Sequence, residues 1–328
     1  MKRGKSFAIG AVACLVSLVV GGTDRVVSAE KITIGLSSTD ALYGPWFYAH
    51  EKGYFTKHGF ETTINILESG TRCVQALVGQ SIDVCAADGS ALMNAVFAGS
   101  DIAYVGSTFN YVAGDIYGNR NVTSPAMIKS GKWAISTFGA ESHMVARITI
   151  KHFNLAENDV TILQIGNQNN RLAALDTGQV QATSLAPPAN FRAAAMGLPR
   201  LAKLSDLGLE YLSVGPAVSK KYIQQQRASV KRLLQALGEA TPAYQKDREG
   251  AVEVLQKWLK ITDRKQAEDT WEYFAPSHDV NLRVTPKSFD IPLRFSDNPK
   301  APTAKISDFA DLSILEELHK EGFFQKLK

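Results

Sequence analysis

The runs KITIGL (residues 31–36), FETTINIL (60–67) and IDVCAA (82–87) decide the fold class of this 328-residue chain. Each run is short, alternates or concentrates apolar residues, and is bounded by Gly, Ser or Asp, as strands are. Helix-like segments of about ten residues separate the runs, which is typical of strands that lie parallel in a sheet covered on both faces. The sequence therefore predicts an α/β fold.

A second series of the same kind begins near Gly131. The runs KWAIS (132–136), VTILQI (160–165) and QATSL (181–185) alternate with two helix-like segments. At roughly 150 residues per domain, the length allows two domains with a core each. From residue 229 onwards the chain is expected to be mainly helical, and Pro242 is expected to kink or end the first of these helices.

The N-terminus has the order of a secretory signal peptide. Lys2, Arg3 and Lys5 precede an uncharged run over residues 6–23, and Val27-Ser28-Ala29 then ends in a small residue. Cleavage after Ala29 removes four basic residues and one acidic residue, so the net charge falls from +4 to about +1. We therefore expect a periplasmic protein that binds no nucleic acid and is not inserted in the membrane; an uncleaved anchor is the weaker alternative.

Cysteine usage agrees with export. Cys14 leaves with the leader, and only Cys73 and Cys85 remain, which are too few for a disulfide framework or a cysteine zinc site. Buried free thiols are the favoured interpretation, and a disulfide in an oxidising compartment is the alternative.

Signatures of catalysis are missing from the sequence. It contains no G-x-S-x-G, H-E-x-x-H or G-x-G-x-x-G motif, and its six histidines lack the spacing of metal ligands. No pair of acidic residues stands out as an acid/base couple. We therefore expect a protein that is not an enzyme and has no cofactor or metal.

Small polar clusters follow the predicted strands in both halves of the chain. Ligands of α/β proteins bind beyond the carboxyl ends of strands, where helix N-termini favour anions. The clusters together predict a polar, anion-binding cleft, whereas each alone is also explained by helix capping. The candidate binding residues are Ser37, Ser38, Thr39, Tyr43, Trp46, Ser69, Thr71, Arg72, Asp88, Ser90, Thr137, Ser142 and Asn167.

Five side chains have specific alternatives. Tyr43 and Trp46 are suited to pack over a planar ligand, although Trp46 fits a core position equally well. Arg72 is suited to bind a carboxylate or sulfonate, or else is solvated. Asp88 either accepts a hydrogen bond from a ligand amine or caps its helix, and the cap is favoured. Arg171 is expected to brace its loop.

Four motifs occur in a familiar order: EKGYFTKHGF (51–60), GQSIDV (79–84), SGKWAI (130–135) and RLAALDTG (171–178). On these motifs the chain resembles the type II periplasmic substrate-binding proteins of the nitrate/sulfonate/taurine class, which includes binders of thiamine pyrimidine precursors. Ser130 departs from the leucine usual in the third motif. A related enzymatic branch, a pyrimidine synthase, carries a cysteine-rich motif that this chain lacks.

The resemblance implies two lobes joined by a two-strand hinge that close around a ligand. Lobe 1 would comprise residues 30–109 and 214–328, and lobe 2 residues 110–213, with crossings near 108–113 and 211–218. It implies a monomer that delivers a small, anionic organic ligand to the permease and ATPase of an ABC importer. The alternatives are a pyrimidine-like heterocycle stacked on Tyr43 and Trp46, or a sensory role beside a membrane kinase.

Overall fold

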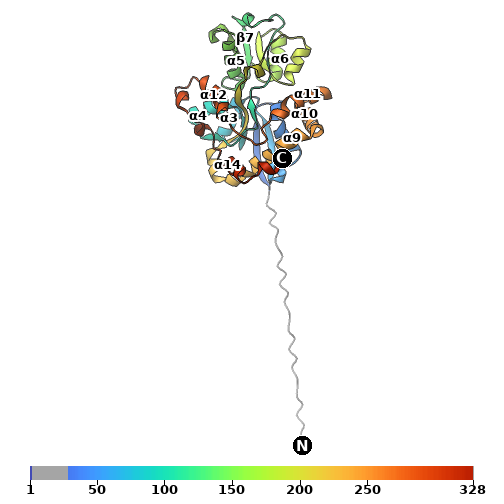
Figure 1. The fold of residues 1–328 in the computed structure, drawn as a ribbon, viewed down its shortest axis with the longest axis vertical. Helices are drawn as coiled ribbons and strands as arrows, with labels where there is room; N and C mark the ends of the chain where they lie inside the picture. The colour runs from blue at the N-terminus through green and yellow to red at the C-terminus, as the bar shows by residue number, and fades with distance from the viewer. Residues whose placement is uncertain (2–28, 328) are drawn as a thin grey trace.

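Two β-sheets, each covered by helices, form the cores of two lobes (Figure 1). The computed structural model describes residue 1 and residues 29–327. The charged and apolar parts of the predicted leader, within residues 2–28, lie outside the described residues. The α/β fold class predicted from the sequence is confirmed.

The first sheet has the strand order β2-β1-β3-β11-β4, and β5 pairs with β11 beside this path. Strand β1 pairs in parallel with both β2 and β3, as predicted, whereas β11 runs antiparallel to its neighbours. The strands of the first sheet are β1 (Glu30–Leu36), β2 (Phe60–Ile66), β3 (Val84–Ala87), β4 (Ile102–Tyr104), β5 (Phe109–Tyr111) and β11 (Glu210–Ser219).

The second sheet has the order β10-β6-β9-β7-β8. Strand β7 pairs in parallel with β8 and β9, and β6 runs antiparallel to β9 and β10. Its strands are β6 (Asp115–Gly118), β7 (Lys132–Ile135), β8 (Thr161–Gln164), β9 (Ala182–Leu185) and β10 (Arg200–Lys203). Both sheets are thus mixed, because the segments that connect the lobes enter each sheet against the direction of its parallel strands.

Helices cover both faces of the first sheet because its strands are apolar on both sides. Val84 and Ala86 of β3 pack toward α1, α9 and α10, and Cys85 and Ala87 pack toward α3 and α4. In Figure 1, α3, α4 and α12 lie on one side of this lobe and α9, α10 and α11 on the other. The helices of this lobe are α1 (Gly44–Glu51), α2 (Tyr54–Lys57), α3 (Gly70–Val78), α4 (Gly89–Phe97), α8 (Lys220–Gln225), α9 (Arg227–Lys246), α10 (Arg248–Leu259), α11 (Arg264–Phe274), α12 (Lys287–Arg294), α13 (Ile306–Phe309) and α14 (Ser313–Lys320). Those of the second lobe are α5 (Glu141–His152), α6 (Gln168–Asp176) and α7 (Ala189–Ala195).

One helix prediction needs correction, and for a second only one of its two alternatives is excluded. The helix expected over residues 46–58 is divided into α1 and α2, because Gly53 has a φ of +76°, a left-handed conformation that ends a helix. Pro242 does not end its helix, since α9 continues to Lys246. Leu237 and Tyr244 are fully buried on either side of the proline, and this packing holds the helix together despite the missing N–H.

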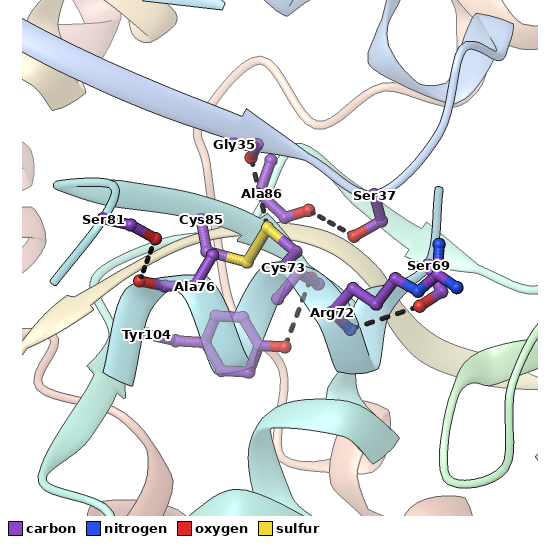
Figure 2. The surroundings of a disulfide bond; sticks show 11 residues. Gly35, Ser37, Ser69, Arg72, Cys73, Ala76, Ser81, Cys85, Ala86 and Tyr104 are labelled. Carbon is purple, nitrogen blue, oxygen red and sulfur yellow. Dashed lines mark hydrogen bonds between the residues drawn. A yellow bond between two sulfur atoms is a disulfide. The ribbon is translucent and has the colours of Figure 1, made fainter. Parts of the chain in front are cut away.

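The favoured interpretation of the cysteines was also wrong. Cys73 of α3 and Cys85 of β3 form a disulfide, with a Cα–Cα distance of 5.8 Å (Figure 2). Both residues are fully buried between the helix and the sheet. The bond therefore ties α3, whose N-terminus lies at the site described below, directly to the sheet.

The chain passes between the lobes through β5 and β11, which pair with each other. These strands coincide with the two segments where the sequence places the crossings. Tyr211, Leu212 and Val214 of β11 are buried, so this connection is packed against protein along its length. The exact lobe boundaries and their role as a hinge stay predictions.

Candidate functional site

A polar cavity of about 110 Å³ lies between the two lobes. Its lining comes from the loop after β1, the N-termini of α3, α4, α5 and α6, the segment after β9, and β11. This is the edge of both sheets at which the polar clusters were predicted to meet. The predicted binding residues that line it are Ser37, Ser38, Tyr43, Ser69, Asp88, Ser142 and Asn167.

Three of these residues cap helices while they line the cavity. Ser69 Oγ accepts from the Arg72 N–H at 3.2 Å, Asp88 Oδ1 from the Ala91 N–H at 3.1 Å, and Asn167 Oδ1 from the Asn170 N–H at 3.1 Å. Capping and a position in the cleft are therefore compatible, because the helices begin where the cleft lies. Their role as ligand contacts stays a prediction.

Trp46 and Arg72 lie outside the cavity. Trp46 is fully buried in the core of the first lobe, and its Nε1 donates to Thr108 Oγ1 at 3.1 Å. Arg72 is exposed and pairs with Glu68 at 3.3 Å, and Figure 2 shows its side chain extended away from the disulfide. Of the interpretations left open, core packing for Trp46 and a solvated surface for Arg72 agree with these positions.

The other four predicted residues also lie off the cavity. Thr71 Oγ1 donates to Phe138 O at 3.1 Å, and Ser90 Oγ donates to Met144 Sδ at 3.3 Å, so both contact the opposite lobe. Thr39 is exposed to solvent. Thr137 Oγ1 is buried without a hydrogen-bond partner among the described residues.

Three carboxylates dominate the chemistry of the cavity, namely Asp40 and Asp88 of the first lobe and Glu141 of the second. Burial raises the pKa of Asp40 and of Asp88. Burial, followed by repulsion from Asp88, raises the pKa of Glu141 well above its usual value. The site therefore holds several acidic groups in a space where ionisation is costly.

Asp40 connects the lobes. Its Oδ1 accepts from the Leu42 N–H at 3.0 Å, and its Oδ2 accepts from Ser38 Oγ and from Gln168 Nε2, each at 2.9 Å. Gln168 begins α6 in the second lobe, and its Oε1 accepts from the Ala186 N–H at 2.6 Å. The hydrogen bond between Asp40 and Gln168 therefore joins the two walls of the cavity.

Asp88 is held in place by Tyr211 of the crossing strand β11. The Tyr211 hydroxyl donates to Asp88 Oδ1 at 2.7 Å, and both side chains are buried. The Asp88 carboxylate also faces the backbone N–H of Glu141 at the start of α5. One carboxylate thus contacts the first lobe, the connection between the lobes and the second lobe.

Arg171 is the cation of the cavity, and among its described lining residues no other lysine or arginine occurs. The side chain is only 6% exposed, and its Nη1 donates to Ser184 O at 2.7 Å and to Ser184 Oγ at 3.2 Å. Burial lowers the pKa of Arg171 to about 10, so it stays charged at neutral pH. The expectation that Arg171 braces its surroundings agrees with these bonds.

Sequence reasoning missed Asp40; it placed Gln168 and Glu141 in the polar clusters of the cleft without naming them as ligand contacts, and it expected Arg171 to brace its loop. All three acidic or amide residues adjoin a predicted binding residue: Asp40 follows Thr39, Gln168 follows Asn167, and Glu141 precedes Ser142. A useful signal was available, because the loops after parallel strands lie at one edge of a sheet and bring polar side chains from several loops near one another. The excess of acidic over basic side chains in the combined clusters bears on the charge of the ligand.

The lobes contact each other around the cavity. Besides the Asp40–Gln168 bond, Asn94 Nδ2 of α4 donates to Gly139 O at 3.3 Å. On the same side, Arg147 of α5 binds the Asp297 carboxylate through two hydrogen bonds of 3.0 and 3.1 Å and donates to Phe295 O at 2.5 Å. These contacts join the two lobes on one side of the cavity.

A family with the description "NMT1/THI5 like" matches residues 41–251, which is more than half of the chain. The chain belongs to this family. Among curated proteins none matches. Solved structures match in large number and cover both lobes together.

Three of these structures illustrate the similarity. The percentages in parentheses give the covered share of this chain and then of the matched chain. The periplasmic nitrate-binding protein NrtA from Synechocystis PCC 6803 has a TM-score of 0.73 at 14% identity (89% and 89%). The ligand-binding component of an ABC-type import system from Staphylococcus aureus, with zinc bound, has 0.72 at 13% (88% and 98%). The alkanesulfonate-binding protein SsuA from Xanthomonas axonopodis pv. citri, bound to MOPS, has 0.70 at 20% (88% and 96%).

At these identities the comparison with solved structures establishes a shared fold, that of periplasmic binding proteins. Membership of the family rests on the match over residues 41–251. The similar structures are mainly binding proteins, including components of ABC import systems. The predicted resemblance and fold are thereby confirmed. Within the described residues, no helix combines the length and apolarity that crossing a bilayer requires.

Proposed function

We propose that this protein is exported to the periplasm, binds a small organic solute in the cavity between its lobes, and delivers it to the permease and ATPase of an ABC importer. The observation that carries the proposal is the cavity itself, whose wall is shared by both lobes and bridged by Asp40 and Gln168. A ligand enclosed there favours the closed arrangement, since it contacts both lobes only when they meet. In this role the protein is a binding protein without catalysis.

The chemistry of the cavity bears on the class of ligand. The sequence-based expectation of a sulfonate or carboxylate rested on Arg72 and on free helix N-termini. Arg72 instead pairs with Glu68, and the N-termini of α4 and α5 carry the carboxylates of Asp88 and Glu141. The alternative of a nitrogen-containing heterocycle is therefore the better supported of the two, with Tyr43 as the aromatic wall of the cavity.

Thermal unfolding of the mature protein, residues 30–328, against a ligand panel tests the function. The panel includes nitrate, alkanesulfonates, taurine, carboxylates and aminopyrimidines. A ligand at about 100 times its Kd stabilises the folded protein by about 2.7 kcal/mol, which raises Tm by a few degrees. Stabilisation by one chemical class identifies the solute and supports the function.

Native mass spectrometry of the same sample reveals a solute retained from the host. A sample that is empty by mass and unresponsive to the whole panel contradicts the proposal. A retained molecule is released by unfolding and refolding, and its mass then identifies the class to add to the panel.

Removing the contact between Arg147 and Asp297 is expected to favour the open arrangement. The Arg147→Gln variant loses the paired bonds to Asp297 and the bond to Phe295 O, and we expect about tenfold weaker solute binding. Asp297→Asn is the milder control, because Asp297 is 86% exposed and such pairs contribute less than about 1 kcal/mol. Small-angle scattering measures the change as a larger radius of gyration with solute present; an unchanged radius and affinity in Arg147→Gln would contradict a role in closure.

A further inference from the structure

The charge of the cavity is unbalanced. Asp40, Asp88 and Glu141 line it together with a single guanidinium, that of Arg171, among the described lining residues. Glu68, which also borders the cavity, is exposed and paired with Arg72. The three enclosed carboxylates come from both lobes, so the imbalance exists only where the lobes meet.

We propose that the solute is a small organic cation, whose positively charged nitrogen group lies between Asp88 and Glu141 and whose neutral hydrogen-bond acceptor faces Arg171. This inference rests on the proposed function and names the class of its ligand. Protonated amines, amidines and aminated heterocycles have this chemistry. An anionic solute would add to the excess of negative charge in a buried space.

Arg171 supplies an observation independent of the carboxylates. Its Nη1 is bound to Ser184, but its Nε–H has no acceptor among the described residues although the side chain is buried and lines the cavity. Buried donors in proteins nearly always find a partner. A carbonyl, hydroxyl or ring-nitrogen acceptor on the solute satisfies this donor without adding charge.

Closure of the lobes explains why a cation is selected. The Asp88 carboxylate faces the backbone N–H of Glu141, so the two acidic residues approach each other when α4 and α5 meet. Like charges a few ångströms apart disfavour ionisation of both. The empty cleft therefore resists closure at neutral pH, and a cationic group between the carboxylates removes that resistance.

Charged and titratable side chains from both lobes lie near Glu141. Asp88 and Asp40 repel its carboxylate, and Arg171 attracts it. The hydroxyls of Tyr43, Tyr104 and Tyr211 lie close enough to Glu141 that its charge raises their pKa further beyond the effect of burial. These tyrosines stay neutral at physiological pH, so the balance near Glu141 is set by the carboxylates and Arg171.

Two sets of matched probes test the charge of the ligand on refolded, solute-free protein. The first set is benzamidinium, benzamide and benzoate, and the second is butylammonium, butanol and butyrate. Members of a set share size and differ in charge, so thermal stabilisation by the cation and not by its partners is the expected result. Any solute retained by the protein from its host is identified by mass and is expected to be a cation at neutral pH.

Glu141→Gln and Asp88→Asn then locate the charge. Each keeps the shape of the side chain, and the amide oxygen introduced by Asp88→Asn can still cap α4, so the fold is retained. We expect at least tenfold weaker binding of the cation and a smaller preference for it over its neutral partner, an effect that a merely structural role would not produce. Glu61→Gln removes an exposed glutamate of β2 and serves as the control that changes neither.

Three results overturn the inference, and they can be distinguished from one another. Binding of benzoate, butyrate or another anion in place of the cations leaves the proposed function intact and rejects the cationic ligand. A solute-free protein that binds no probe and no member of the wider panel rejects both. Cation binding that Glu141→Gln and Asp88→Asn leave unchanged places the ligand elsewhere and also rejects the inference.

The pH dependence of closure gives a readout that needs no ligand. Because the pKa values of Asp88 and Glu141 are raised, acidification protonates them before ordinary carboxylates. The radius of gyration of the solute-free protein should therefore fall as pH is lowered from about 7 toward about 4.5, near the ordinary carboxylate range, whereas Glu141→Gln should show the smaller radius at neutral pH. Equal radii for both proteins across this range contradict the role of Glu141 in opposing closure.

Discussion

Gly70→Ala is expected to weaken solute binding at least tenfold and to destabilise the protein by about 2 kcal/mol. A Cβ at this position, the first residue of α3, would overlap Asp88 Oδ2 and lie 2.9 Å from Asp88 Cγ. The carboxylate cannot move freely, because it accepts from the Ala91 N–H and the Tyr211 hydroxyl. Displacing it removes a helix cap and leaves a buried hydroxyl with one partner fewer.

Gly89→Ala is the matched control for this prediction. Gly89 is likewise the first residue of its helix, α4, but a Cβ there meets its nearest atoms at 3.4 Å, which is ordinary van der Waals contact. Chemical denaturation measures the loss of stability, and thermal shift with the solute found by the panel measures binding. Equal behaviour of the two variants would show that Asp88 does not need the space that Gly70 leaves.

Removing the disulfide is expected to lower the free energy of unfolding by about 3 kcal/mol, because the bond closes a short loop in the unfolded chain. Cys73 and Cys85 are 12 residues apart and both are fully buried. For a chain of this size the loss corresponds to a fall in Tm of roughly 5 °C. The Cys73→Ala/Cys85→Ala double variant and reductant acting on the native protein should have similar effects.

The same double variant provides the control for the reductant. Its Tm should not respond to dithiothreitol, since no bond remains to be reduced in the mature chain. Solute binding should be weakened little, because Ser69 and Asp88 cap their helices independently of the sulfur atoms. A native protein whose Tm is unchanged after complete reduction, verified by mass, would contradict a stabilising role for the bond.

Proteins that share this fold bind ligands of different classes, so the fold alone does not identify the ligand. The Synechocystis and Xanthomonas proteins are described as binders of nitrate and alkanesulfonate, and both share the two-lobed fold with this chain at 20% identity or less. Ligand class in such folds depends on the few side chains that loops place in the cleft. In this chain Asp40, Asp88, Glu141 and Arg171 line the cavity between the lobes, and we propose that they select the ligand.

Local patterns in the sequence were enough to predict the α/β architecture. Short runs such as KITIGL and KWAIS have the patterning of strands, and the helix-like segments between them favour a parallel arrangement of those strands. The same local pattern located the polar clusters at one edge of each sheet, and seven of the thirteen predicted residues line the cavity there. These features follow from periodicity and chain direction, which are local properties.

Which of those side chains face the cavity depends on tertiary packing, which the local patterns did not reveal. Arg72 and Arg171 both lie in the first turn of a helix, yet Arg72 points to solvent and Arg171 is buried beside Ser184. Trp46 is fully buried in the core and donates to Thr108, which is distant in sequence. The disulfide likewise required α3 to pack on β3 so that two cysteine Cα atoms came within 5.8 Å. The orientation of a side chain, the proximity of residues distant in sequence and the net charge of a cavity shared by two lobes all arise from long-range packing. Local sequence patterns carry no information about that packing.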